Sequence, residues 1–262
     1  MYEKDELIAA LRRMGIGPQD TLLVHSSMKS IGPVNGRADT VLDALSEYLQ
    51  PGLLVFPTLS YGQINSEHPR FSVTETPSEC GILSELFRQR PGVIRSWHPT
   101  HSLAALGPDA AALVAGHECF ETPCARRSPW GRLVDRHAKL LFIGTGISCN
   151  TLLHGVEEWA RVPNSMTHRP QRLEILTPDG RVIPCPSLRH MGARSQFYDK
   201  MEDLYEYAGM LRRGTFGDAV CHLLDVRPMA ALTLRLLRED RHLFDDDRLP
   251  VPQWLTEPGG ID

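Results

Sequence analysis

The chain has 262 residues, of which 42% are hydrophobic and 23% are charged, so it is long enough to bury a substantial core without disulfides. Its 28 basic and 32 acidic residues give a net charge of −4, which argues against the positive field that nucleic-acid binding requires. We therefore expect a globular protein with no nucleic-acid partner.

The N-terminal sequence is charged and lacks the apolar segment of a secretory signal. The most apolar stretches, residues 53–57 and 139–143, are strand-sized, well short of the roughly 18 to 20 residues that a membrane helix needs. The six cysteines contain no CxxC pair, which predicts isolated thiols in a reducing compartment. The sequence thus predicts a cytoplasmic protein with no membrane partner and no bound metal.

Helical and β-rich segments alternate along the chain, which predicts an α/β fold with a mixed, largely parallel sheet covered by helices. Apolar periodicity and capping signals predict helices over residues 5–14, 39–48, 82–89 and 108–116, and one starting near residue 150. Short buried runs predict strands at residues 21–25, 53–57 and 139–144, and in the second half of 95–107. Between them, the polar residues 60–78 predict a functional loop.

Beyond residue 163 the alternation of helices and strands gives way to a predicted hairpin followed by helices. Residues 172–176 and 181–185 flank Pro178-Asp179-Gly180, which is typical of a hairpin turn. Two helices are expected after the hairpin, over about 196–210 and 217–239. We therefore expect residues 1–163 to form the core region, and residues 164–262 to form a hairpin-and-helix annex packed on the same domain.

One cluster with chemical potential is Thr151, His154 and Glu157, at spacings of three on the first turns of the last core helix. A carboxylate beside an imidazole fixes its tautomer and raises its basicity, which makes histidine a general base at neutral pH. The alternative is a capped helix N-terminus that carries a surface histidine and glutamate. Spacing alone does not decide between them.

A second cluster, His25-Ser26-Ser27, follows the first strand, where open α/β sheets place their ligands. Its hydroxyls and backbone amides, with the charge of Lys29, suit a phosphate group, although an ordinary serine-rich turn has the same pattern. There is no GxGxxG or Walker A motif, so neither a dinucleotide-binding fold nor an NTPase is indicated.

A third segment runs from Arg95 to Ser102 and contains His98 and His101. Two histidines three residues apart can ligate a metal, but Pro99 interrupts the helix that would align them. A loop that contacts a bound ligand is the better functional interpretation, with Arg95 available for an anion. A cysteine nucleophile at Cys149 lacks any local Cys-His signature.

Seven segments in order resemble the aminoglycoside 3-N-acetyltransferase family, whose fold is unrelated to that of the GNAT enzymes. They are LLVHSSMKSIG, LLVFPTLS, Thr76-Pro77 with Gly81 ahead of Phe87-Arg88, PGVIRSWHPTHSLAALG, HECFETPCARRSPWGRLV, KLLFIGTGISCNTLLHGVEEWARVP and RRGTFGDAV. The resemblance covers residues 20–163 well and the remainder thinly.

The resemblance implies acetyl transfer from acetyl-CoA to the amine of a small molecule by direct attack in a ternary complex. His154 would be the general base, Glu157 would orient it, Thr151 would line the same face, and His25 would lie near the thioester. The residues expected around CoA are Ser26, Ser27, Lys29, Ser30, Arg95, Ser96, His98 and Ser102. Thr58 and Glu158 would contact the acceptor.

The acceptor itself stays open, because a polycationic aminoglycoside needs a carboxylate-lined cleft whereas residues 165–200 are basic. An aminoglycoside-like antibiotic and another amine metabolite that carries phosphate or carboxylate both fit, and the arginines can also simply face solvent. Two other functions remain: a metal-dependent amidohydrolase using His25, His98, His101 and His154, and a catalytically silent CoA-binding protein. A monomer or a homodimer is expected.

Overall fold

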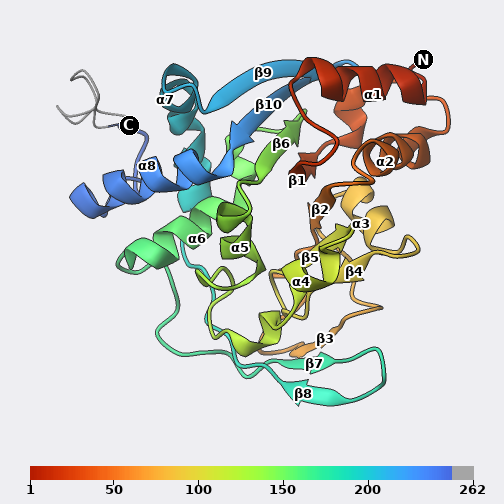
Figure 1. Cartoon of the computed structure of the whole chain (residues 1–262). Coiled ribbons are helices and arrows are strands. Elements are labelled where there is room, and N and C mark those ends of the chain that lie inside the picture. Colours follow the sequence, from red (N-terminus) through yellow and green to blue (C-terminus); the bar gives the residue numbers. More distant parts are fainter. Residues whose placement is uncertain (250–262) are drawn as a thin grey trace.

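The computed structural model describes residues 1–249 and is built around a seven-stranded sheet (Figure 1). The strand order is β4-β5-β2-β1-β6-β10-β9. The strands are β1 (Thr21–Ser26), β2 (Leu53–Pro57), β4 (Ile94–Arg95), β5 (Leu103–Leu106), β6 (Lys139–Ile143), β9 (Leu211–Phe216) and β10 (Ala219–Asp225). The central strands β2, β1 and β6 are parallel, and the strands outside them pair antiparallel. This confirms the predicted α/β class with a mixed sheet.

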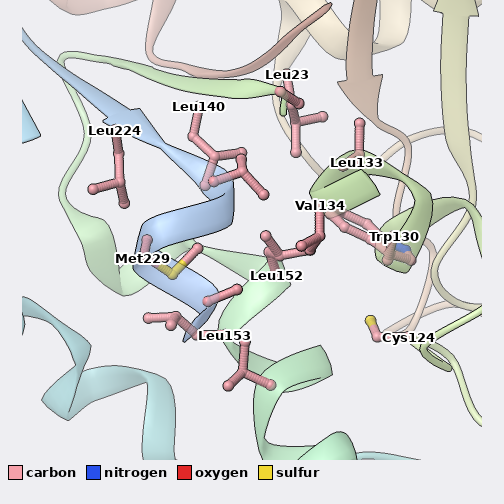
Figure 2. Packing of buried hydrophobic residues seen from close by; sticks show 14 of the residues in the cluster. Leu23, Cys124, Trp130, Leu133, Val134, Leu140, Leu152, Leu153, Leu224 and Met229 are labelled. Atoms are coloured by element: carbon pink, nitrogen blue, oxygen red, sulfur yellow. The ribbon is translucent and has the colours of Figure 1, made fainter. Parts of the chain in front are cut away.

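Helices cover both faces of the sheet because its central strands are apolar on both sides. In β1, Leu22 and Val24 belong to one core cluster, while Leu23 between them belongs to the other. The first cluster packs under α1 (Lys4–Arg13), α2 (Arg37–Tyr48) and α3 (Ile82–Arg88). The second packs under α4 (Ala110–Val114), α5 (Pro129–Asp135), α6 (Thr151–Ala160), α7 (Glu202–Tyr207) and α8 (Val226–Glu239), part of it seen in Figure 2. No helix within residues 1–249 is both long and apolar enough to cross a membrane.

A small second sheet lies at the edge of the molecule (Figure 1). Its strands β3 (Arg70–Ser72), β7 (Glu174–Leu176) and β8 (Val182–Pro184) run in the order β3-β7-β8, with β7 and β8 antiparallel. The predicted hairpin is therefore present, and it recruits β3 from the segment 60–78. Phe71 and Ile175 are fully buried in the sheet's own small core.

The structure differs from the expected helix over residues 217–239. Residues 219–225 form β10, which pairs with both β6 and β9, and α8 begins only at Val226. The reason is an alternation of period two: Cys221 and Leu223 enter one core cluster, whereas Leu224 enters the other. The helix expected over 196–210 is a 3-10 helix, η4 (Arg194–Met201), followed by α7. The main sheet thus draws strands from both sides of residue 163, and residues 250–262 of the expected annex lie outside the described residues.

The carboxyl ends of β1 and β6 lie side by side, with Ser26 in register with Ile143. Short 3-10 helices follow both strands, η1 (Met28–Ile31) after β1 and η3 (Ile147–Cys149) after β6; a further one is η2 (His117–Cys119). Asn150 then caps α6, since its side-chain oxygen accepts a hydrogen bond from the Leu152 amide at 3.1 Å. This arrangement places the first turns of α6 at the end of the parallel strands.

Candidate active site

A cavity of about 790 Å³ opens at the carboxyl ends of β1 and β6, which is where ligands bind in open α/β sheets. Its wall is formed by the segment after β1, residues 59–61 and 79–82, the stretch from the end of β6 to the start of α6, and the residues around His101 and His190. The predicted site residues that line it are His25, Ser26, Ser27, Lys29, Thr151 and His154.

His154 is held along one edge of its ring. Its Nδ1 lies 3.1 Å from Oε2 of Glu157 and 2.8 Å from the hydroxyl of Tyr198, and that hydroxyl donates to Glu157 Oε2 at 2.5 Å. The Glu157 side chain is only 2% exposed, so its carboxylate selects the His154 tautomer with the proton on Nδ1. Within residues 1–249 no protein group bonds Nε2, and this nitrogen keeps a lone pair for a ligand in the cavity that His154 lines.

Burial lowers the pKa of His154 below its ordinary 6.5, and the hydrogen bond to Glu157 partly opposes this effect. The imidazole is therefore neutral at pH 7, as a general base must be. Burial beside the Glu157 carboxylate raises the pKa of Tyr198 well above its ordinary range, so the phenol stays a hydrogen-bond donor.

His25 ends β1 with its ring stacked against Phe142, the two centroids being 5.1 Å apart. Burial lowers the pKa of His25 to about 4, so the ring is neutral at pH 7 and carries one N–H. Its Nε2 is buried and has no partner within the described residues. A neutral ring with an unused nitrogen at the cavity wall can donate to an oxygen of a ligand.

The serine cluster after β1 divides into two parts. Ser26, Ser27 and Lys29 line the cavity. Ser30 lies behind them and donates from Oγ to Ser27 Oγ at 2.9 Å and to the Gly144 carbonyl at 3.3 Å. Ser30 therefore holds Ser27 in place and ties η1 to the segment after β6.

Arg95, Thr58 and Ser102 do not line the cavity, although the sequence placed them at CoA or the acceptor. The Arg95 side chain donates to three backbone carbonyls, those of Thr58, Val73 and Thr76, at 2.6 to 3.2 Å. Its Nε also faces the hydroxyls of Thr58 and Ser102. Burial lowers the pKa of Arg95 to about 9. The buried guanidinium thus links β4 to Thr58 and to residues 73–76.

Ser96 and His98 are also buried behind the cavity wall. Ser96 Oγ accepts from the Leu103 amide and lies 2.8 Å from His117 Nδ1. His98 Nδ1 accepts from the His101 amide at 3.0 Å, and burial holds its pKa well below 6.5. The structure gives both side chains protein partners in place of the expected CoA contacts.

Glu158 lies behind His190 and does not line this cavity. Its Oε1 accepts from His190 Nε2 at 2.7 Å and from the Cys124 amide at 2.9 Å. The His190 ring stacks on His154, with centroids 4.6 Å apart and planes 18° from parallel. The sequence analysis did not single out His190 or Tyr198, since both lie in the annex without a local motif.

The four histidines of the amidohydrolase alternative do not gather around one point. Among residues 1–249, the metal-ligating atoms that lie within 4.8 Å of one another come from Cys124, Glu158 and His190. Glu158 already accepts the His190 proton there, and burial raises the pKa of Cys124 well above 9.0. These contacts form a hydrogen-bonded pair beside a neutral thiol.

Comparison with known proteins decides the family. The model of the aminoglycoside 3-N-acetyltransferase family matches residues 23–238. The chain belongs to this family. The predicted family is therefore confirmed, and with it the assignment to the acyltransferases.

Several aminoglycoside acetyltransferases are similar to the chain over most of its length. Aminoglycoside N(3)-acetyltransferase III of Acinetobacter baumannii is 27% identical, over 99% of this chain and all of that protein. Aminoglycoside N(3)-acetyltransferase IV of a Salmonella species is 30% identical, over 93% of this chain and 90% of that protein. The crystal structure of aminoglycoside acetyltransferase AAC(3)-IVa superposes with a TM-score of 0.80 at 29% identity, covering 93% of this chain and 91% of that one.

We expect Tyr198→Phe to lower kcat by about 10-fold, because the variant loses the hydroxyl that bridges Glu157 and His154 while it keeps the buried ring. Steady-state kinetics at pH 7 would measure the loss. Tyr205→Phe is the matched control, since its hydroxyl bonds Thr233 in the core away from the cavity. Equal effects of the two substitutions would contradict a role of Tyr198 in holding His154 and Glu157.

Proposed function

We propose that the chain is an acetyl-CoA-dependent N-acetyltransferase that acetylates an amine of a small molecule, with His154 as the general base. The observation that carries this proposal is the buried Glu157–His154 pair, whose second ring nitrogen is left for a ligand in the 790 Å³ cavity. Family membership supports acetyl transfer.

In this reaction the acceptor amine attacks the thioester directly, and one histidine both takes up and returns the proton. The acceptor nitrogen attacks the thioester carbonyl carbon while His154 Nε2 takes the N–H proton, and Glu157 stabilises the imidazolium that forms. When the tetrahedral intermediate collapses, the C–S bond breaks and His154 returns the proton to the thiolate sulfur. The products are the amide and free CoA.

In this proposal acetyl-CoA, the acyl donor, binds along the segment after β1. Ser26, Ser27 and Lys29 offer hydroxyls, backbone amides and a positive charge on the cavity wall, and these groups suit the pantetheine and phosphates of CoA. The neutral His25 ring lies in the same segment and would donate its N–H to the oxyanion. The solved structure of AAC-IIIb with CoASH, at 23% identity, has the same fold.

The acceptor is an aminoglycoside-like antibiotic or another amine metabolite. The printed names of the relatives specify aminoglycosides, and one solved neighbour is in complex with apramycin. In this chain, however, the charged lining of the cavity consists of Lys29, Arg189 and Glu79, besides its histidines. The other basic side chains of residues 165–200 include Arg181, Arg194 and Lys200, which bind protein oxygens. A cavity with one carboxylate also admits an amine that carries an anionic group.

A titration with acetyl-CoA by calorimetry, followed by thiol release in the same sample, tests the proposal. We expect one acetyl-CoA per chain, and thiol release with at least one amine from a panel of kanamycin-type aminoglycosides and small anionic amines. Thiol release with aminoglycosides would mean that the protein inactivates antibiotics. Thiol release only with anionic amines would mean that its acceptor is a metabolite. Absence of acetyl-CoA binding would overturn the proposed function.

A further inference from the structure

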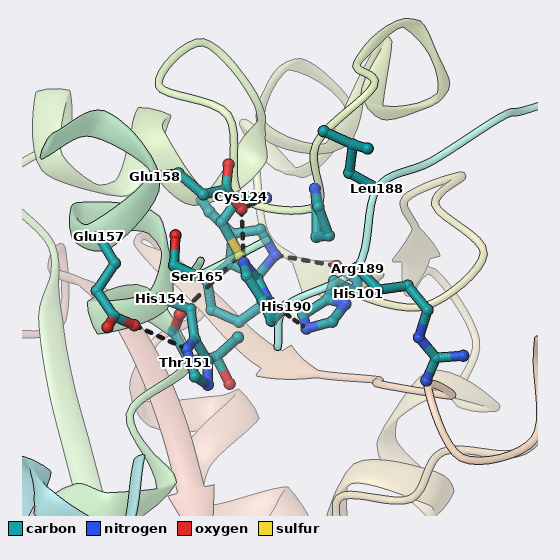
Figure 3. Close-up of polar contacts among 12 residues, drawn as sticks. His101, Cys124, Thr151, His154, Glu157, Glu158, Ser165, Leu188, Arg189 and His190 are labelled. Carbon is teal, nitrogen blue, oxygen red and sulfur yellow. Dashed lines mark hydrogen bonds and ion pairs between the residues drawn. The ribbon is translucent and has the colours of Figure 1, made fainter. Parts of the chain in front are cut away.

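His154 has a neighbour on the face of its ring as well as at its Nδ1 edge. His190 covers that face, and Figure 3 shows the two rings beside α6 with Glu158 behind His190. We propose that His190, which is anchored by Glu158, is a positioning residue for His154. It fixes the ring of His154, and its charge influences the charge of His154. This inference rests on the proposed function, in which His154 is the base.

The anchor of His190 is buried and hydrogen-bonded. Glu158 and His190 have side chains only 5% and 11% exposed, and their atoms Oε1 and Nε2 are 2.7 Å apart. The Cys124 amide holds the same oxygen from the other side at 2.9 Å. A ring fixed in this way limits the rotation of the ring that stacks on it, and the Nδ1 bonds of His154 fix the remaining direction.

His190 cannot itself remove a proton from a substrate, because both of its ring nitrogens already have protein partners. Nε2 meets Glu158, and Nδ1 lies 3.3 Å from His101 Nε2. The role of His190 therefore acts through His154, whose Nε2 is the ring nitrogen left for the cavity.

The bonds of His190 persist in both of its charge states. When it is neutral, Nδ1 accepts from His101 Nε2–H, and His101 Nδ1 accepts from the Thr100 hydroxyl at 2.9 Å. When it is protonated, Nδ1–H donates to His101 Nε2, and the His101 proton moves to Nδ1 and donates to Thr100. Burial keeps the pKa of His101 well below 6.5, so His101 stays neutral in either case. His190 thus keeps its contacts with Glu158 and His101 in either charge state.

The charge on His190 matters because it opposes that of two carboxylates. A positive His190 lowers the pKa of His154, whereas Glu157 and Glu158 raise it. Within residues 1–249, polar groups near these side chains include the Tyr198 phenol, the Cys124 thiol, neutral His101, and Arg194, which lies 3.8 Å from Glu157 and 2.6 Å from Asp245. Removing His190 leaves the Glu158 carboxylate with only the Cys124 amide as a partner, and the loss of a positive charge together with this freed carboxylate raises the pKa of His154.

The test compares His190→Ala with His190→Phe, which keeps a flat ring over His154 but has no charge and no bond to Glu158. We expect His190→Ala to lower kcat by about 10-fold or more, and His190→Phe to retain more activity than it. KM for acetyl-CoA should change less than about 3-fold in both variants. In His190→Phe the acid limb of the kcat/KM profile should move to higher pH, since His154 stays protonated to higher pH.

His137→Ala is the matched control, because His137 is an exposed histidine at the amino end of β6, away from the cavity. His190→Gln keeps an amide N–H for Glu158 and serves if the first two variants do not fold. The imidazole pKa of His154, measured by NMR titration of the free protein, should rise in every His190 variant, and this readout needs no turnover. Unchanged kcat and an unchanged His154 pKa would overturn the inference. Failure of the wild type to bind acetyl-CoA, with a raised His154 pKa in the variants, would instead reject the proposed function alone.

Discussion

Replacing His154 by alanine is expected to lower kcat for thiol release by about 10²-fold or more, because the acceptor nitrogen then loses the base that takes its proton. The Kd for acetyl-CoA should stay within about 2-fold, since the segment after β1 still offers its serines and Lys29. Steady-state kinetics and calorimetry on the same preparation measure both quantities.

Two controls distinguish the loss of a proton acceptor from a general disruption of the folded protein. His137→Ala removes an exposed imidazole at the opposite end of the strands and should leave kcat unchanged. Raising the pH should restore part of the activity of His154→Ala, because more of the acceptor is then a free amine. Turnover that survives the loss of His154 would remove it from the role of base.

Substitution of Arg95 by methionine is expected to destabilise the protein by about 3 to 5 kcal/mol. The carbonyls of Thr58, Val73 and Thr76 would lose their donor inside the protein, and each buried acceptor left without a partner carries its full desolvation cost. Denaturant unfolding measures the loss. In thermal unfolding we expect a decrease in Tm of about 10 °C.

Arg70→Met is the matched control for this prediction. Arg70 forms an ion pair with Glu174, but its side chain is 58% exposed, and exposed pairs contribute only about 0 to 1 kcal/mol. Folded Arg95→Met should bind acetyl-CoA with the wild-type Kd. A variant of normal stability with weakened acetyl-CoA binding would show that Arg95 contacts the ligand after all.

The sequence predicted the contact between His154 and Glu157 because its parts are local. Asn150, His154 and Glu157 lie within one helix start, where capping and a spacing of three residues fix their relation before any tertiary packing. Tyr198 joins the same pair from 44 residues away, and His190 reaches Glu158 across 32 residues. No spacing rule connects such positions, and the folding of the annex over α6 brings them together.

The segment from Arg95 to Ser102 shows why composition alone does not predict where side chains point. Arginine, serine and histidine in one segment are typical of a ligand-binding loop, but the same groups also satisfy one another when buried. Pairing of β4 with β5 places Arg95 opposite Ala104, and its side chain is buried against residues 73–76. The direction in which a two-residue strand presents its side chains depends on that pairing, which the local pattern does not contain.

The packing of α6 on α8 has a consequence for synthesis. Leu152 and Met229 belong to the same core cluster (Figure 2), so the helix that carries His154 meets its apolar partner only after the whole segment from β7 to β10 has been added. On the ribosome, a nascent chain that ends before residue 226 exposes the apolar side of α6. The packing of α6 is therefore completed late, and a protein cut short in α8 would leave the helix of His154 without its apolar partner.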